Sequence, residues 1–208
     1  MDAKENVSNV FYRPFLVCIA GFILFFLAMV LFRTRTEIRR RRLQALTVLT
    51  LFLTFDLVLF GAFTRLTDSG LGCPDWPGCY GNASPLGAHA EITAAQTAMP
   101  TGPVTHRKAW VEMVHRYLAT SVGFLILVIT VASWVEYSRS RAQRGAGAAV
   151  SAPVLSPWWP TVTLVWVCIQ GAFGALTVTM KLFPAIVTLH LVGGLVLLFL
   201  LRAAHGLC

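Results

Sequence analysis

The stretch Thr64–Gly81 reads TRLTDSGLGCPDWPGCYG and separates two strongly apolar segments of the chain. Its two cysteines, Cys73 and Cys79, enclose two prolines and a tryptophan. Proline fixes a backbone torsion angle, so a proline-rich turn with a cysteine at each end suits a shaped loop better than a flexible tether. Shaped surface loops often carry function, and this loop is therefore the first candidate for a functional surface.

The composition around this loop indicates a membrane protein. Of the 208 residues, 56% are hydrophobic and only 12% are charged, about half the charged share of a typical soluble domain. Apolar runs of roughly 18 residues or more recur, and such a run crosses a bilayer as a helix. The sequence therefore predicts an all-α fold, a polytopic helix bundle in the lipid bilayer.

Each apolar run is expected to form one transmembrane helix, with a long external loop over residues 64–108. The expected helices are Pro14–Phe32, Leu43–Phe63, Ala109–Tyr137, Trp158–Met180 and Ala185–Arg202. We divide the chain into residues 1–42, an extra N-terminal helix with a basic loop, and residues 43–208, a four-helix bundle. Small residues let membrane helices approach closely, and the glycines of the last two helices are predicted to do so: Gly171, Gly174, Gly193 and Gly194.

The net charge of +8 arises from two basic blocks, Arg33–Arg42 and Arg139–Arg144, which each adjoin an apolar run. This pattern follows the positive-inside rule rather than that of a nucleic-acid-binding surface. It places the N-terminus in the periplasm of a bacterial inner membrane, the C-terminus in the cytoplasm and the long loop outside. An oxidising outer compartment favours a disulfide between Cys73 and Cys79, while a redox-active pair is the alternative.

Two histidines lie within the predicted membrane helices. His115 and His190 each lie about six residues, or roughly 9 Å, inside the external end of a helix. Two imidazoles at matched depth could be the axial ligands of one heme iron. Hydrogen bonds across the bundle are the alternative, although ionisable groups within a membrane are commonly functional.

Several charged residues lie near the same end of the bundle. Glu112 precedes His115 by three residues, so both project from one helical face. Its carboxylate could transfer protons, or it could be an acid favoured at a helix N-terminus. Arg65, Arg116 and Lys181 could pair with the propionates of a heme, or anchor their helices at the membrane interface.

Three segments, Thr64–Gly81, Glu112–Ala119 (EMVHRYLA) and Gln170–Gly194 (QGAFGALTVTMKLFPAIVTLHLVGG), together resemble the heme A synthases. These are membrane oxidoreductases of heme biosynthesis and cytochrome oxidase assembly, and the likeness is to the bacterial subtype with a loop cysteine pair. The resemblance implies oxidation of a ring methyl of heme O to the formyl group of heme A. It also implies eight helices in two pseudo-symmetric halves, an N-terminal half for the substrate heme and a C-terminal half for a heme b cofactor.

The resemblance also implies residue roles. His115 and His190 correspond to the histidine pair of the N-terminal half, which binds the heme iron. Glu112 corresponds to the functional glutamate of the family, and Cys73 and Cys79 to its loop cysteines. Heme O synthase is the implied partner that supplies the substrate.

Two departures from the family pattern shape the functional expectation. Residues 1–42 add a helix before the first helix of the family, and the chain ends after what would be the fourth. We therefore expect a truncated product, or a heme A synthase that works only with a second half supplied by a homologous chain. The alternatives are a non-catalytic heme-binding or oxidase assembly module and, from another functional class, a small transporter subunit.

Overall fold

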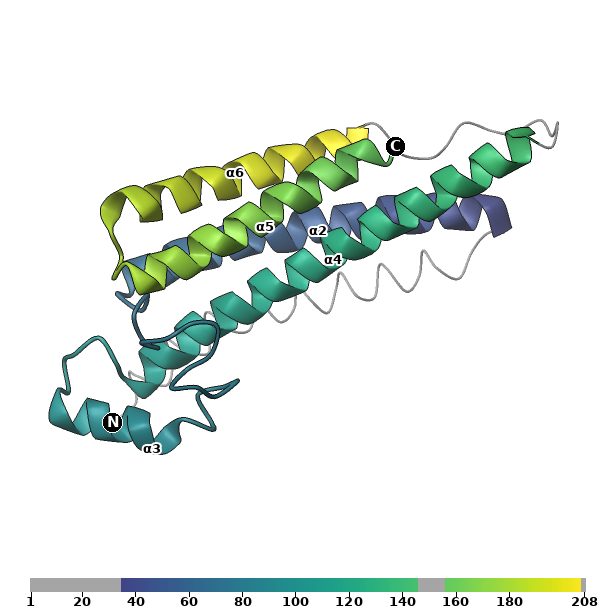
Figure 1. Cartoon of the computed structure of the whole chain (residues 1–208). Coiled ribbons are helices and arrows are strands. Elements are labelled where there is room, and N and C mark those ends of the chain that lie inside the picture. The colour runs from purple at the N-terminus through teal and green to yellow at the C-terminus, as the bar shows by residue number, and fades with distance from the viewer. Residues whose placement is uncertain (1–34, 146–155, 207–208) are drawn as a thin grey trace, which may run out of the picture. The chain divides into compact units, whose positions relative to one another are not determined.

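The computed structural model describes residues 35–145 and 156–206, and every regular element within these ranges is a helix (Figure 1). The prediction of an all-α fold is therefore confirmed. The expected helix over residues 14–32 lies outside the described residues. The described helices, numbered as in Figure 1, are α2 (Arg35–Leu66), α3 (His89–Ala98), α4 (His106–Gly145), α5 (Trp158–Thr179) and α6 (Pro184–Gly206).

Four of these helices are long and apolar enough to cross a membrane, which confirms four of the five expected spans. Their apolar spans are Arg41–Leu66, His106–Ala142, Trp158–Thr179 and Pro184–Ala204. The chain divides into two compact units, residues 1–45 and residues 46–208. The second unit contains the long loop and both intramembrane histidines, and the description below concerns this unit.

Helix α5 packs directly against both α4 and α6. The indole of Trp166 donates to the carbonyl oxygen of Gly193 on α6 at 2.9 Å, and the indole of Trp134 on α4 donates to the hydroxyl of Thr161 at 3.0 Å. Hydrogen bonds and close packing hold membrane helices together, because lipid provides no hydrophobic driving force between them. Helices α4, α5 and α6 therefore form a connected layer of the bundle.

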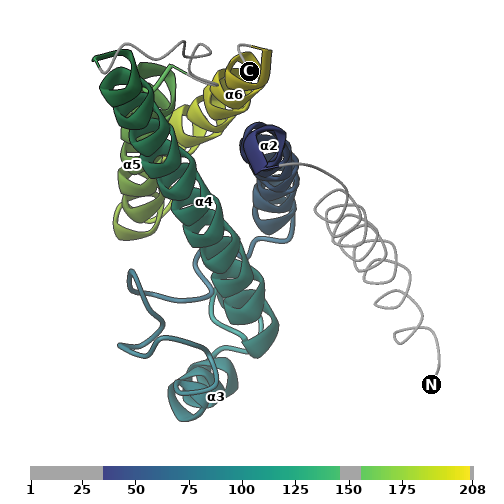
Figure 2. The same ribbon diagram turned by 90° about the vertical axis from the view of Figure 1, so that its right-hand side faces the viewer.

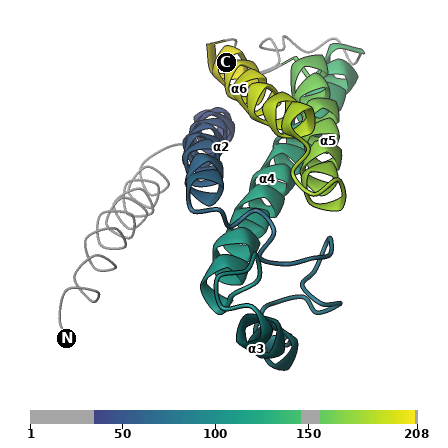
Figure 3. The same cartoon turned by 90° about the vertical axis from the view of Figure 1, so that its left-hand side faces the viewer.

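Helix α2 stands further from this layer. Among the described helices, no Cα atom of α2 lies within 8 Å of a Cα atom of α4, α5 or α6. Figure 2 and Figure 3 show α2 apart from α5, with α4 and α6 between them. Side chains join the four helices instead, in a core centred on Val122, Ile126, Leu197 and Leu201 and flanked by Leu51, Leu53, Leu57, Leu164, Trp166 and Val167.

The external segment is more structured than the predicted loop. It contains the short helix α3, and α4 begins at His106 rather than at Ala109. Thr105 caps α4, since its hydroxyl accepts a hydrogen bond from the Lys108 backbone N–H at 3.3 Å. Such an N-cap satisfies a backbone donor that has no partner within the helix. The side chain of Gln96, on α3, also accepts from the His106 backbone N–H at 2.9 Å, which fixes α3 to the start of α4.

Candidate functional site

The disulfide loop lies on the N-terminal end of α4. Cys73 and Cys79 form a disulfide, and both are fully buried. They pack in a small core with residues of α3 and α4, among them Ile92, Ala109 and Met113. The predicted disulfide is confirmed, and a redox role for the pair stays a prediction.

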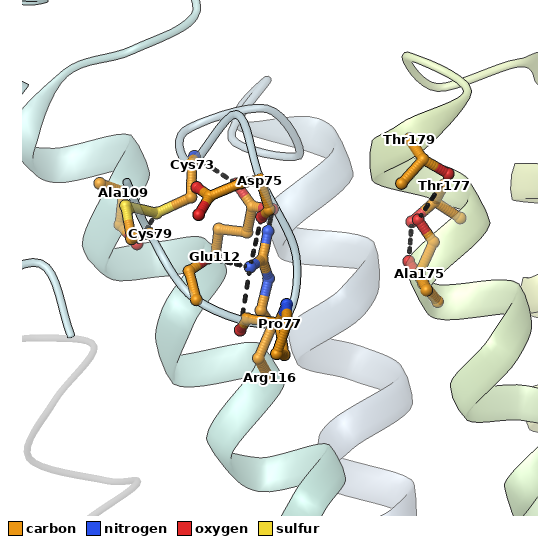
Figure 4. A network of polar contacts seen from close by, with 12 residues as sticks. Cys73, Asp75, Pro77, Cys79, Ala109, Glu112, Arg116, Ala175, Thr177 and Thr179 are labelled. Carbon is orange, nitrogen blue, oxygen red and sulfur yellow. Dashed lines mark hydrogen bonds and ion pairs between the residues drawn. A yellow bond between two sulfur atoms is a disulfide. The ribbon is translucent and has the colours of Figure 1, made fainter. Parts of the chain in front are cut away.

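Glu112 joins α4 to this loop (Figure 4). One carboxylate oxygen accepts a hydrogen bond from the Cys73 backbone N–H at 2.8 Å, and the other accepts from the guanidinium of Arg116. Glu112 is only 4% exposed. A buried carboxylate needs both an opposite charge and hydrogen-bond donors, and Glu112 has both.

Arg116 extends the same network into the loop. Its Nη1 atom donates to the Asp75 carbonyl oxygen at 2.8 Å and also to the carbonyl oxygens of Pro77 and Gly78. The Asp75 carboxylate in turn accepts from two backbone N–H groups of the loop. We call Glu112, Arg116 and the loop Cys73–Cys79 the loop clamp.

The observed contacts of Glu112 and Arg116 do not test the roles predicted for them. Proton transfer by Glu112 and propionate binding by Arg116 stay predictions, because the observed partners of both side chains belong to the loop or to each other. Sequence spacing indicates an ion pair between residues four apart on a helix. It does not reveal that both side chains also bind loop backbone atoms.

His115 lies on the same helix as the clamp and faces α2. Its ring stacks on Phe60 at a centroid distance of 6.4 Å and an interplanar angle of 11°. Gly61 lies beside the ring, since a Cβ atom at Gly61 would be only 3.0 Å from His115 Cε1. The Nδ1 atom of His115 is buried and has no hydrogen-bond partner among the described residues.

His190 on α6 has a similar environment against α5. A Cβ atom at Gly174 would lie 3.5 Å from His190 Cε1. The Nδ1 atom of His190 is also buried and lacks a hydrogen-bond partner within the described part of the chain. Both histidines lie on helices that run in the same direction in the bundle (Figure 1). We call His115, His190, Phe60, Gly61 and Gly174 the histidine site.

The depths of the two histidines differ from the prediction. His190 follows the first residue of α6, Pro184, by six positions. His115 follows the first residue of α4, His106, by nine positions, because the Thr105 cap begins α4 earlier than expected. Helices α4 and α6 nevertheless run in the same direction, so both histidines enter the bundle from the same end (Figure 1).

Other candidate residues lie outside this site. Arg65 ends α2 and Lys181 lies in the turn between α5 and α6, and both are exposed. Neither has an ion-pair partner within residues 35–145 or 156–206. Their predicted contact with propionates stays a prediction. Asp56 of α2 is half-buried, and no hydrogen bond or ion pair joins it to another described residue.

Sequence reasoning overlooked Gln170 of α5. Its side chain is buried, and its Oε1 atom lacks a hydrogen-bond partner among the described residues. Its amide lies against Gly193, where a Cβ atom would be 1.9 Å from Gln170 Nε2. A polar amide within an apolar helix is itself a sequence signal for a functional residue. The predicted close approach holds at Gly174, Gly193 and Gly194, whereas nothing lies within 4 Å of a Cβ atom at Gly171.

Comparison with known proteins identifies the family. The sequence profile of the cytochrome oxidase assembly proteins (COX15-CtaA) matches residues 44–205. The chain belongs to this family. It is 40% identical over 153 residues to the heme A synthase of Shewanella oneidensis, covering 74% of this chain and 42% of that protein. With the heme A synthase of Lysinibacillus sphaericus it shares 29% identity over 72% of this chain and 39% of the relative.

A shorter segment of the chain is similar to a protein with a different name. A stretch of 46 residues is 50% identical to heme exporter protein C of Rhodobacter capsulatus, which is 22% of this chain and 19% of that protein. The chain thus spans about two fifths of the length of the heme A synthases above and less of the exporter protein. The resemblance inferred from the three sequence motifs is confirmed at the level of the family.

Proposed function

We propose that this chain forms the substrate-heme half of a heme A synthase and binds heme O between His115 and His190. The observation that carries this proposal is the pair of half-buried imidazoles on α4 and α6, each with a buried Nδ1 atom that lacks a partner in the described residues. Histidine is a common axial ligand of heme iron. A ligating histidine uses one ring nitrogen for the metal and offers the other to a second partner, and the Nδ1 atom of each ring has no such partner among the described residues.

The surroundings of the rings suit a large planar ligand. The imidazoles lie close against Gly61 and Gly174, where a larger side chain would crowd them, and Phe60 offers an aromatic surface next to His115. Helix α2 stands off from α4 and α6, so side chains rather than backbone contacts border this part of the bundle. Heme O, once bound, supplies both the iron and the ring methyl that becomes the formyl group of heme A.

The loop clamp would cover the external end of this site. We assign Glu112 a role in holding the disulfide loop, in addition to the catalytic role that the family resemblance implies. Arg65 and Lys181 are exposed at the same end, and we propose that they meet the heme propionates. Arg116 has its Nη1 atom bound to loop carbonyl oxygens, so any propionate contact would use its remaining donors.

Oxidation itself would require more than this chain. Since the chain spans 42% of the relative from Shewanella oneidensis, we propose that residues 43–208 supply the substrate half and that a homologous half supplies the heme b cofactor. Heme O synthase would deliver the substrate. The proposed setting is the inner membrane of a bacterium, with the disulfide loop in the periplasm, the N-terminus outside and the C-terminus inside.

A second function is a heme-binding or oxidase assembly module without catalysis. The short likeness to heme exporter protein C favours it, since that name describes heme handling rather than oxidation. Both functions need His115 and His190, and they differ in whether heme A is formed.

The test is to purify the chain from cells that contain heme O synthase and to record its absorption spectrum and extracted hemes. We expect a low-spin Soret band in the wild type that disappears in His115→Ala and His190→Ala. His89→Ala is the matched control, because His89 is an exposed histidine of α3. Heme A formed when a homologous second half is also present supports oxidation, and heme O alone under those same conditions supports the binding module. Wild-type protein without heme would refute both.

A further inference from the structure

The described residues contain three buried polar side-chain atoms without a hydrogen-bond partner. They are Nδ1 of His115, Nδ1 of His190 and Oε1 of Gln170. Buried polar atoms are nearly always paired, so each exception needs an explanation. The proposed heme site accounts for the two histidines. The amide of Gln170 is not used by that proposal.

Gln170 belongs to the same region as His190. Gly174, which is one turn further along α5, lies beside the His190 ring. The Gln170 amide packs on Gly193, which is three residues after His190 on α6. These contacts place the unpaired amide oxygen of Gln170 between α5 and α6, within one helical turn of His190.

The amide lies on the deeper side of the site. Three residues along a helix correspond to about 4.5 Å, so Gly193 and the amide on it lie further from the external end than His190 does. The proposed propionate partners, Arg65 and Lys181, lie at that external end. A heme with its propionates facing outward would therefore present its opposite, apolar edge toward Gln170.

Heme O has one polar group on that edge. It is the hydroxyl on the carbon that joins the isoprenoid chain to the ring, and heme B has a vinyl group at the same position. A buried amide oxygen can accept a hydrogen bond from this hydroxyl and cannot do so from a vinyl group. Sites built to bind a hydroxyl discriminate strongly against ligands that lack it, because the buried partner is then left unpaired.

We propose that Gln170 accepts a hydrogen bond from the isoprenoid-chain hydroxyl of heme O and thereby selects heme O over heme B. This inference rests on the proposed binding of heme by His115 and His190. Trp166 already donates to the Gly193 carbonyl at 2.9 Å, so the indole holds the α6 backbone against which the amide lies. Gly193 is also required for this hydrogen bond, because a Cβ atom at that position would displace the Gln170 amide.

The experiment compares two hemes on the full chain in lipid nanodiscs. Heme O and heme B are titrated into the wild type, Gln170→Met, and the control Thr163→Val. Thr163 is a buried polar residue on the same helix, but its hydroxyl already donates to the Trp159 carbonyl at 3.0 Å. We expect the wild type to bind heme O about tenfold more tightly than heme B. Gln170→Met should reduce this preference to what the isoprenoid chain alone contributes and leave heme B affinity unchanged, while Thr163→Val should keep the whole preference.

A second variant protects the test against misfolding. Gly193→Ala leaves the glutamine in the sequence and moves its amide, so it should also lose the preference for heme O. An equal loss of affinity for both hemes would mean that Gln170 stabilises the fold and does not recognise the hydroxyl of heme O. This result would overturn the inference. So would an unchanged preference in Gln170→Met. Failure of the wild type to bind either heme would instead refute the proposed function.

Discussion

The loop clamp and the histidine site lie within one helical turn of each other on α4, yet they differ in how their polar groups are satisfied. In the clamp, Glu112 and Arg116 bind each other and the loop backbone. In the histidine site, two buried ring nitrogens lack partners among the described residues. A polar network that is complete holds structure, whereas buried polar atoms left unpaired need a separate explanation, for which we propose heme binding.

This contrast separates two roles that sequence motifs combine. The motif EMVHRYLA contains Glu112, His115 and Arg116 in five consecutive positions. Its charged members turn toward the loop, and its histidine turns toward Phe60 and Gly61 of α2. Mutations in the clamp should therefore change stability, and mutations in the histidine site should change heme affinity.

The largest effect on stability is expected from Arg116→Leu. The side chains of Arg116 and Glu112 are 12% and 5% exposed, so removal of the arginine leaves a buried carboxylate without its cation. Breaking a buried ion pair in this way costs about 3–5 kcal/mol. Thermal unfolding of the purified chain, monitored by size-exclusion chromatography, measures this loss of stability.

The control for this prediction is an ion pair with one well-exposed partner. Lys108→Ala removes an ion pair of 3.3 Å to Asp68, whose side chain is 75% exposed, and should cost at most about 1 kcal/mol. The double variant Glu112→Leu with Arg116→Leu should recover much of the stability, because apolar replacement of both partners leaves no buried charge. If Arg116→Leu were as stable as Lys108→Ala, the clamp would not hold the fold.

The disulfide should contribute a smaller amount. Replacing Cys73 and Cys79 by alanine should lower stability by about 2 kcal/mol, the chain-entropy value for so short a loop. Limited proteolysis of the external segment and thermal unfolding would measure the change. The same variant also distinguishes a structural from a redox pair. Retained heme binding with loss of heme A formation, in the presence of the second half, would show that the thiols act in the reaction.

The sequence alone was sufficient for much of this architecture. Apolar runs predicted all four described membrane spans, because bilayer thickness imposes a minimum length on each. Intramembrane histidines and a close cysteine pair also stand out in a linear sequence. The missed features depend on local or distant partners. Helix α3 is rich in alanine and buries only Ile92 fully, so its pattern has little contrast between apolar and polar positions.

The contacts of the site were less predictable for a related reason. Arg116 binds the carbonyl oxygens of residues 38 to 41 positions earlier, and only the folded loop brings these together. Gln170 was recognisable as a polar residue in an apolar helix. Its position beside His190 depends on the pairing of α5 with α6 and on the absence of a side chain at Gly193.

The smallest expected effects come from the two glycines of the histidine site, and they sharpen the comparison because they leave every polar group in place. A Cβ atom at Gly61 would lie 3.0 Å from His115, and one at Gly174 would lie 3.5 Å from His190. The first distance requires the ring to shift and the second is an ordinary contact. Gly61→Ala should therefore weaken heme binding about tenfold, within the usual cost of overpacking, and Gly174→Ala about twofold or less.

Heme titration followed at the Soret band measures both effects, and Gly171→Ala is the control, since nothing lies within 4 Å of a Cβ atom at that position. All three variants should unfold at nearly the wild-type temperature, because alanine is a better helix former than glycine and none of the three touches the clamp. Gly61→Ala with normal heme affinity and reduced stability would reverse the assignment. His115 would then be a packing residue, and the distinction between a structural clamp and a ligand site on α4 would fail.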